Sequence, residues 1–400
     1  MIDVAIVGAG IVGLATAREI TARHRGLTIA VLDKEPGVAR HQSGRNSGVL
    51  HSGIYYAPGS LKARLCVDGA QRLAEYCSER GIEVRRCGKL VVAVSDAERG
   101  RLHELHRRGL ANGARGLELV GPQRIRELEP HVAGVEGLLV PGTGIVDYGL
   151  VAAAYADDVV AAGGSLLLGA EVTGIVEYRD QIVLQTTAGE VQARHVVGCA
   201  GVYSDRLARL QGADRDPQIV PFRGDYLVLR PESRYLADRR LIYPVPDPSF
   251  PFLGIHSTLR PDGDVWLGPN AVLALGREGY RRRDFELGDL AETFRSDGFR
   301  RLARRHWKTG GAEVVRDLSP HLFVRQARRL LPGLSVEDVR PGPSGIRAQA
   351  LAADGSLVDD FVLEARGRAV HVRNAPSPGA TSSLAIAGVI VDMLEETFAW

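Results

Sequence analysis

The chain has 400 residues, of which 45% are hydrophobic and 24% charged, and its formal net charge at pH 7 is +2. That length predicts two domains, or one domain with a large insertion. The near balance of acidic and basic residues argues against the overall field that draws a protein to nucleic acid. The four cysteines lack metal-ligand spacing and are too few for a disulfide scaffold, so we expect no metal site and a reducing compartment.

The sequence contains no apolar run of the roughly 18–20 residues that a membrane span requires. A predicted strand begins at residue 2, in the place where a signal peptide would carry a charged and then an apolar segment. We therefore expect a globular protein of the cytoplasm, either soluble or attached to the inner face of the cell membrane.

Residues 2–7 are rich in β-branched side chains and predict a strand that is buried on both faces. Gly8, Gly10 and Gly13 follow, and a helix-prone stretch begins at residue 14. In such a unit the first glycine permits a tight turn, the second lets the backbone approach a pyrophosphate, and the third lets helix and strand pack closely. The diphosphate would then lie against the unpaired N–H groups at the start of the helix.

A second predicted strand covers residues 27–32 and ends at Asp33, 20 positions after Gly13. A carboxylate at this place can accept hydrogen bonds from a ribose. The two strands, the helix and the acid together predict a dinucleotide site, which could hold NAD or FAD. Since the sequence lacks a second nicotinamide fingerprint, a bound flavin is favoured over a flavoprotein reductase.

The segment 33–59 is predicted to be a loop rich in Gly, Ser, His and Asn, and a loop of this length is usually functional. Its glycines would allow close approach to a flat ligand, and its polar side chains would supply donors; the alternative is a solvated crossover. Ser60 is predicted to cap one helix and Asp147 another. Residues 198–201 form a second glycine-rich strand end, which could meet the first one on the same nucleotide.

The fold class predicted from these patterns is α/β. Residues 218–269 alternate apolar and polar side chains and predict an antiparallel sheet, whereas residues 280–330 return to helix. We expect a Rossmann-like, FAD-binding domain built from discontinuous segments and an α+β substrate domain with a mixed or antiparallel sheet. The predicted segments are 1–88, 145–215 and 335–400 for the FAD-binding domain, and 89–144 and 216–334 for the substrate-binding domain.

At this point the sequence resembles a known family. Val4–Gly13 with Asp33, Gly198–Gly201, and Gly379-Ala380-Thr381 before a predicted helix are similar to FAD-dependent oxidoreductases of the D-amino-acid oxidase group. More narrowly, the strings at 46–56, 268–274 and 374–378, extended by 277–280, resemble the L-2-hydroxyglutarate dehydrogenase/oxidase family over essentially the whole chain. Asp33 is a mild departure, because many relatives carry Glu there, and either carboxylate can hold a ribose.

The resemblance implies a bound FAD that oxidises the C2 hydroxyl of (S)-2-hydroxyglutarate to 2-oxoglutarate by hydride transfer to flavin N5. Electrons would pass to a membrane quinone or another acceptor, with oxygen a slower one. The expected partners are therefore a small 2-hydroxy dicarboxylic acid and an electron acceptor, with no nucleic acid. The residues expected to bind FAD are Gly8, Gly10, Gly13, Asp33, Lys34, Asn46, Ser47, Gly48, Val172, Gly201, Gly379, Ala380 and Thr381.

Three residues are candidates for catalysis. His256 is our first choice for the base that takes the hydroxyl proton, because the unperturbed pKa of histidine lies near physiological pH. His51 is expected to contact flavin or substrate, and a covalent bond to flavin is left open although noncovalent FAD is favoured. Arg347 is expected to bind a carboxylate with two parallel hydrogen bonds. The alternative for either histidine is a hydrogen-bonded structural role, and the alternative for Arg347 is an interdomain ion pair.

Four further side chains are expected to bind the substrate. Arg223 is the second candidate for a carboxylate, with a purely structural role as its alternative. Tyr56, Tyr243 and Asn374 would donate to the substrate, although buried tyrosines usually need only a local partner.

The stretch 299–308 contains five Lys or Arg residues and no acid. Helical spacing groups Phe299, Leu302, Ala303 and Trp307 on one side. Such a face can lie on an anionic bilayer near a quinone, so we expect a peripheral membrane contact here. The alternative is a solvated helix that packs on its own domain.

Two other functions remain open at this point. One is oxidation of an amine or amino acid, as in relatives of sarcosine or glycine oxidase, which needs one carboxylate site rather than two. The other is a flavin-containing protein that modifies or binds RNA, against which the near-neutral charge argues. The sequence leaves open the electron acceptor, the oligomeric state and the preference among 2-hydroxy acids.

Overall fold

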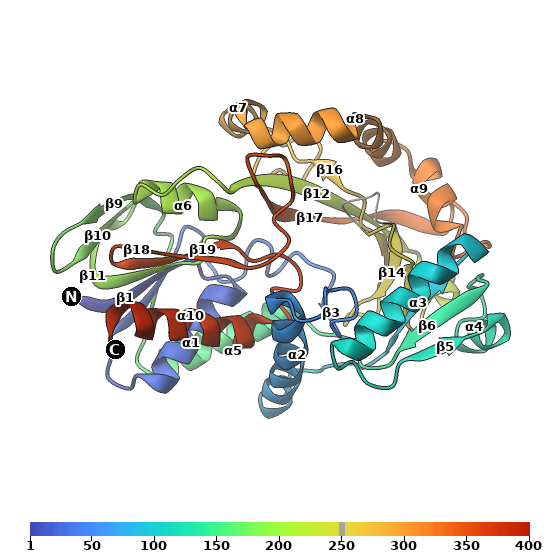
Figure 1. The fold of residues 1–400 in the computed structure, drawn as a ribbon, viewed down its shortest axis with the longest axis horizontal. Coiled ribbons are helices and arrows are strands. Elements are labelled where there is room, and N and C mark those ends of the chain that lie inside the picture. Colours follow the sequence, from blue (N-terminus) through green and yellow to red (C-terminus); the bar gives the residue numbers. More distant parts are fainter. Residues whose placement is uncertain (248–252) are drawn as a thin grey trace.

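The computed structural model describes residues 1–247 and 253–400 (Figure 1). Within these residues the strands form two large sheets, of eight and nine strands, and one two-stranded ribbon. Figure 1 shows the two sheets on opposite sides of the molecule, with both termini beside the first one. The ribbon pairs β3 (Val49–Leu50) with β7 (Gly144–Ile145).

The first sheet is parallel at its centre. Its order is β18-β19-β11-β1-β2-β8, in which β8, β2, β1, β11 and β19 pair in parallel, while β18 and the hairpin β9–β10 add antiparallel strands. The strands are β1 (Ile2–Val7), β2 (Ile29–Asp33), β8 (Ser165–Leu168), β9 (Val172–Glu177), β10 (Ile182–Thr186), β11 (Gly189–Gly198), β18 (Val362–Arg366) and β19 (Ala369–Asn374).

Helices cover both faces of this sheet, as expected for parallel strands with apolar side chains on each side. Val4 and Ile6 of β1 belong to one buried cluster with helical residues such as Leu14, whereas Ala5 packs on the opposite face. The helices of the first face are α1 (Ile11–Arg23), α2 (Leu61–Glu79), α5 (Tyr148–Ala161) and α10 (Ser383–Phe398). On the other face lies α6 (Ser204–Leu210), whose Leu207 packs there; the 3₁₀ turn η1 (Gly201–Tyr203) precedes it.

The second sheet is mixed, and its order is β16-β12-β15-β14-β13-β4-β6-β5, with β17 paired to the other part of β12. Only the pair β13–β4 is parallel among the pairings of these described strands. The strands are β4 (Lys89–Ala93), β5 (Glu118–Val120), β6 (Glu136–Val140), β12 (Gln218–Leu229), β13 (Leu241–Pro244), β14 (His256–Leu259), β15 (Val265–Gly268), β16 (Val272–Leu273) and β17 (Val339–Leu351).

The helices beside the second sheet leave one of its faces turned toward the first sheet (Figure 1). They are α3 (Asp96–Ala111), α4 (Pro122–Leu128), α7 (Leu287–Arg295), α8 (Asp297–Asp317) and α9 (Pro320–Ala327), with the 3₁₀ helix η2 (Pro231–Leu236) in a loop. No helix in the described part of the chain combines the length and the apolar character that crossing a bilayer requires.

The predicted α/β class and the mixed second sheet are confirmed. So are two helix caps: Ser60 Oγ accepts from the N–H of Ala63, and Asp147 accepts from Gly149. Strand β17 was not predicted. It pairs with β12 along most of its length, so the division expected at residue 335 separates β17 from the sheet that it completes. A boundary that follows the sheets lies after Leu351.

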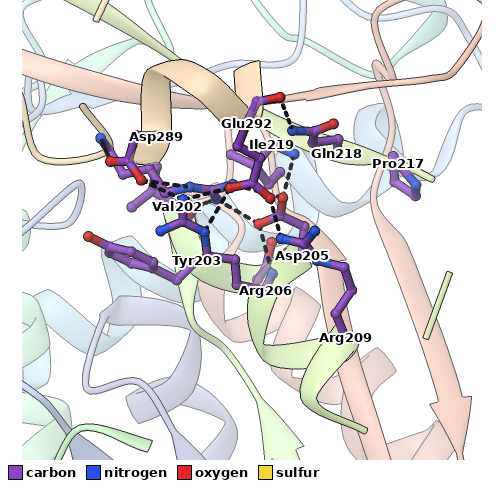
Figure 2. A network of polar contacts seen from close by, with 12 residues as sticks. Val202, Tyr203, Asp205, Arg206, Arg209, Pro217, Gln218, Ile219, Asp289 and Glu292 are labelled. Carbon is purple, nitrogen blue, oxygen red and sulfur yellow. Dashed lines mark hydrogen bonds and ion pairs between the residues drawn. The ribbon is translucent and has the colours of Figure 1, made fainter. Parts of the chain in front are cut away.

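A buried network of charges joins η1 and α6, which follow β11, to α7 and to Arg277 just before it (Figure 2). Arg277 is buried and contacts both Asp205, 2.6 Å away, and Glu292, 3.3 Å away. Asp289 accepts from the backbone N–H of Arg277 at 2.6 Å and from Arg206 at 2.5 Å. Because buried charges are costly unless they are paired and hydrogen-bonded, this set holds α6 and α7 in a fixed relation.

Candidate active site

A cavity of about 1210 Å³ is lined by residues of both sheets. Gly8 and Gly201 lie on its side nearest the first sheet, and His256 and Arg347 belong to the second. Pockets for single small ligands usually measure about 300–1,000 Å³. The cavity therefore has room for a dinucleotide together with a small substrate.

The three glycines after β1 have different surroundings. A Cβ at Gly8 would lie 2.3 Å from the carbonyl oxygen of Cys199, and one at Gly13 would lie 2.0 Å from the carbonyl oxygen of Gly8. At Gly10 the nearest atom would be Ser43 Oγ, at 3.3 Å, and Gly10 lines the cavity. Gly8 and Gly13 thus permit backbone packing, while Gly10 keeps the start of α1 open to a ligand.

Asp33 lies at the end of β2 and lines the cavity. Its Oδ2 accepts from the N–H of Ala9 at 2.7 Å, and its Oδ1 accepts from the N–H of Glu35 at 2.9 Å. These bonds fix the carboxylate, and each oxygen keeps a further lone pair for a ribose hydroxyl. Lys34 also lines the cavity and pairs with Glu35 and Glu278; burial opposes its charge, but the two carboxylates raise its pKa.

The loop before β3 is held by the side chain of Asn46. Its Nδ2 donates to the carbonyl oxygens of Gln42 and Ser43, at 3.0 and 2.7 Å, and its Oδ1 accepts from the N–H of Gly48 at 2.8 Å. Asn46 and the adjacent Ser47 line the cavity. Gly48 does not line the cavity. It cannot be replaced by a residue with a side chain, because its φ is +73° and an added Cβ would lie 2.5 Å from the Arg260 guanidinium.

The C-terminal loop meets this region from the other end of the chain. Gly379, Ala380 and Thr381 line the cavity just before α10 begins. Thr381 Oγ1 accepts from the backbone N–H of His51 at 3.2 Å and bonds to the Tyr148 hydroxyl at 2.7 Å. These contacts place the start of α10, and the positive end of its dipole, at the cavity.

Asn374 lies at the end of β19 and lines the same cavity. Its Nδ2 donates to the carbonyl oxygens of Val358 and Asp360, each at 2.9 Å. Its Oδ1 is buried without a hydrogen-bond partner among the described residues. A buried acceptor of this kind is usually satisfied, so it is suited to a donor from a bound molecule.

His256 is buried at the start of β14 and stacks on Tyr243, with ring centroids 3.9 Å apart. Its Nδ1 lies 2.9 Å from the carbonyl oxygen of Gly254. Because a carbonyl can only accept, Nδ1 carries the proton and Nε2 has a free lone pair in the neutral ring. Burial lowers the pKa of His256 to about 3, so the ring is neutral at pH 7.

His51 faces the same cavity from the loop after β3. Its Nδ1 is buried with no hydrogen-bond partner in the described part of the chain. Burial, with Lys89 and His256 nearby, holds the pKa of His51 well below its usual range. The structure thus brings two neutral histidines together at one end of the cavity.

Arg347 lies on β17 and lines the cavity with Tyr226 and Tyr243. Burial lowers the pKa of its guanidinium, and the two tyrosines oppose that change. Sequence reasoning missed Tyr226, although Gly224 and Tyr226 share one face of β12 at a spacing of two. Tyr55, in the loop after β3, and Lys62, at the start of α2, also line the cavity and were missed.

The structure does not place Arg223 in the cavity lining. Its side chain is 5% exposed, with Nε 3.0 Å from Asp225 and Nη2 3.1 Å from Asp317. Neighbouring side chains of a strand point to opposite faces, so Arg223 points away where Gly224 faces the cavity. The expected role in substrate binding is therefore replaced by an ion-pair role, which the spacing Arg223-Gly224-Asp225 could have indicated.

The predicted site residues fall into those that line the cavity and those that lie outside its lining. Apart from Gly13, Gly48 and Arg223, the predicted site residues line this cavity. These are Gly8, Gly10, Asp33, Lys34, Asn46, Ser47, His51, Tyr56, Val172, Gly201, Tyr243, His256, Arg347, Asn374, Gly379, Ala380 and Thr381.

Comparisons with known proteins agree with this geometry. The family model of FAD dependent oxidoreductases matches residues 3–393. The chain is 50% identical to the mitochondrial L-2-hydroxyglutarate dehydrogenase of Nematostella vectensis, over 99% of this chain and 91% of the relative. It is 43% identical to the L-2-hydroxyglutarate dehydrogenase of Indibacter alkaliphilus, over 99% of each chain.

The fold is also similar to solved structures. For dithionite-reduced L-alpha-glycerophosphate oxidase from Mycoplasma pneumoniae with FAD bound, the TM-score is 0.80 at 23% identity, covering 98% of this chain and 94% of the other. For glycine oxidase from Geobacillus kaustophilus, it is 0.73 at 21% identity, covering 98% and 94%.

The residues around the cavity fit FAD. Gly10 opens the start of α1, Asp33 offers a fixed carboxylate, and the buried Oδ1 of Asn374 lacks a partner among the described residues. The start of α10 adds a second positive helix end. Fold, cavity and family match lead to one conclusion: this chain belongs to the FAD-dependent oxidoreductases.

Proposed function

We propose that the protein oxidises (S)-2-hydroxyglutarate to 2-oxoglutarate with FAD as its cofactor. The observation that carries the proposal is that a partly buried guanidinium, Arg347, and a neutral buried histidine, His256, line one cavity that also has room for FAD. The names of relatives that are 43–50% identical support the choice of substrate.

The chain's own residues would bind and orient the substrate. Arg347 would take a carboxylate with two parallel hydrogen bonds, with Tyr226 and Tyr243 beside it. His256 Nε2 would accept the C2 hydroxyl proton as the C2–H bond breaks and the carbonyl forms. Bound FAD supplies the two-electron acceptor that this oxidation requires. The aromatic rings of Tyr226 and Tyr243 would keep water from the reacting carbon.

A dicarboxylate needs a second polar contact in addition to Arg347. Lys62 lines the cavity, and its Nζ lies 2.8 Å from the exposed carboxylate of Asp359 and 5.1 Å from the ring of Tyr56. Tyr56 and Asn374 remain our proposals for substrate contacts on this side. Shorter acids that reach only Arg347 should bind more weakly.

Anaerobic mixing of the purified flavoprotein with candidate substrates tests the proposal. (S)-2-hydroxyglutarate should bleach the flavin, whereas its mirror image, lactate, glycine and sarcosine should act far more slowly. Faster bleaching by glycine or sarcosine would favour an amine oxidase and overturn the proposal. A colourless protein that cannot be reconstituted with FAD would also refute the proposed function.

We also propose a membrane quinone as the electron acceptor, reached through a peripheral contact at α8. Most of the apolar face expected on residues 299–308 is covered by the protein itself. Phe299 is buried, and Leu302 and Ala303 pack with it against the domain. Trp307 remains, 67% exposed, among exposed basic side chains. Further exposed apolar side chains on α7 and α8 are Leu287, Phe294, Val314 and Val315.

Sedimentation with vesicles tests this contact. The protein should pellet with vesicles that contain anionic lipid at low salt, and less so at high salt. Trp307→Ala should weaken pelleting without changing flavin reduction. A protein that stays in solution with anionic vesicles at low salt contradicts the contact.

A further inference from the structure

Lys89 is a buried amine that the mechanism above does not use. It begins β4, its side chain is 0% exposed, and its Nζ has no hydrogen-bond partner in the described part of the chain. A buried ammonium without a partner is costly, so its presence requires an explanation. Two aromatic rings lie close to it, Tyr243 at 4.1 Å and Tyr55 at 4.9 Å from Nζ to the ring centroid.

These rings belong to the wall of the active-site cavity, because both Tyr55 and Tyr243 line it. Tyr243 in turn stacks on His256. Lys89 therefore lies one layer behind the surface that a substrate would contact, on the far side of the ring that supports the proposed base. A charge at this position acts on the cavity through a thin, low-dielectric layer, where electrostatic effects are strong.

The groups that act on the Lys89 charge include no carboxylate among the described residues. They are the thiols of Cys66 on α2 and Cys87, just before β4, while Lys89 in turn acts on His51 and His256. Burial lowers the pKa of Lys89 to about 7, and burial raises the pKa of Cys66, so that thiol stays protonated. The charge of Lys89 thus has no fixed counter-ion, and an anion that enters the cavity would favour the charged form.

We propose that Lys89 is a positioning residue that takes up a proton from solvent when a dicarboxylate enters the cavity, and so places a positive charge behind Tyr243 only in the filled site. This inference rests on the proposed function, since it takes the ligand to be a dianion. The empty enzyme avoids a buried, uncompensated cation, and the filled one gains a third positive group beside Arg347 and Lys62.

The direction of the proton exchange follows from the chemistry of an amine. At pH 8, one unit above about 7, roughly nine in ten Lys89 side chains are neutral in the empty enzyme. A bound dianion raises the pKa of Lys89, so binding draws on the order of half a proton or more from the buffer. His256 has a pKa of about 3, far below this range, and contributes little.

Titration calorimetry of the holoenzyme with glutarate, an unreactive dicarboxylate, measures this uptake from heats in two buffers of different ionisation enthalpy at pH 8. The wild type should take up about half a proton or more per site. Lys89→Met should take up none and bind glutarate about tenfold more weakly. Lys89→Arg, which is always charged, should keep the affinity but lose the uptake. Lys308→Met is the matched surface control and should behave as wild type.

Two outcomes overturn the inference: uptake that persists in Lys89→Arg, or no uptake in the wild type. If Lys89→Met fails to hold FAD, the arginine variant alone decides. Flavin reduction by (S)-2-hydroxyglutarate without proton uptake refutes the role of Lys89 and leaves the proposed function standing. Proton uptake with glutarate but no flavin reduction refutes the proposed substrate and leaves the role of Lys89 standing. Failure to bind any dicarboxylate refutes both.

Discussion

The two arginines first expected at the substrate can be separated by one pair of variants, Arg223→Met and Arg347→Met. Methionine keeps much of the side-chain volume and removes the charge. Arg223 is buried and holds Asp225 and Asp317, so its loss leaves these two carboxylates with only the exposed Arg282 as a shared cation among the described residues. Breaking a buried ion pair in this way costs about 3–5 kcal/mol of unfolding free energy.

For a chain of this size the cost should be visible in thermal unfolding. With an unfolding entropy of about 2.1 cal/mol/K per residue, a loss of 3–5 kcal/mol lowers the melting temperature by roughly 4–6 °C. Part of the loss is relieved because burial and Asp317 already raise the pKa of Asp225 to about 6, which eases its protonation. Adding Asp317→Asn to Arg223→Met should recover part of the stability.

The assay compares melting of the flavoprotein with the KM for (S)-2-hydroxyglutarate. Arg223→Met should lower the melting temperature and leave KM within about twofold in the protein that remains folded. Arg347→Met is the contrasting variant, with KM altered and melting largely kept. An unchanged melting temperature together with a strongly raised KM in Arg223→Met would refute our placement of that arginine.

Three other predictions follow from the site. Gly13→Ala should prevent folding, because its Cβ would lie 2.0 Å from a backbone oxygen, whereas Gly10→Ala should fold but retain less FAD after gel filtration. Arg347→Met should raise KM about 30- to 150-fold, the equivalent of losing about 2–3 kcal/mol of charge-assisted bonding, as steady-state kinetics would show. Between pH 6 and 4, His256→Asn should lose less stability than wild type, by on the order of 2 kcal/mol in melts at a series of acid pH values. The reason is that the unfolded histidine binds a proton below its ordinary pKa of about 6.5, whereas the folded one stays neutral down to about pH 3.

The nucleotide end of the site was predictable because its determinants are local. Strand, glycine turn, helix and acid follow one another within Ile2–Asp33, and their geometry depends on backbone rules that hold in any context. The N-caps at Ser60 and Asp147 were predictable for the same reason. Their hydrogen bonds span two or three residues, so no distant partner can change them.

The substrate end depends on contacts between distant segments, and here prediction was less complete. The cavity wall joins Tyr226 on β12 to Arg347 on β17, which are brought together by a pairing of two strands that lie over a hundred residues apart. Only that pairing shows which side of β12 faces the cavity, and therefore that Arg223 faces away. Lys89 gave no signal at all, because an apolar strand with one lysine at its start usually places that lysine in solvent.

The histidines show most clearly what burial adds to sequence. His256 was chosen as the base because the ordinary pKa of histidine is near neutrality, yet burial lowers the pKa in the folded chain to about 3. A ring with so low a pKa is always ready to accept a proton but holds it weakly. Its strength as a base must therefore rise when an anionic substrate enters and offsets the nearby positive charge of Arg347. The catalytic competence of His256 is thus a property of the filled cavity, in which the charge of the substrate helps to make the base that deprotonates it.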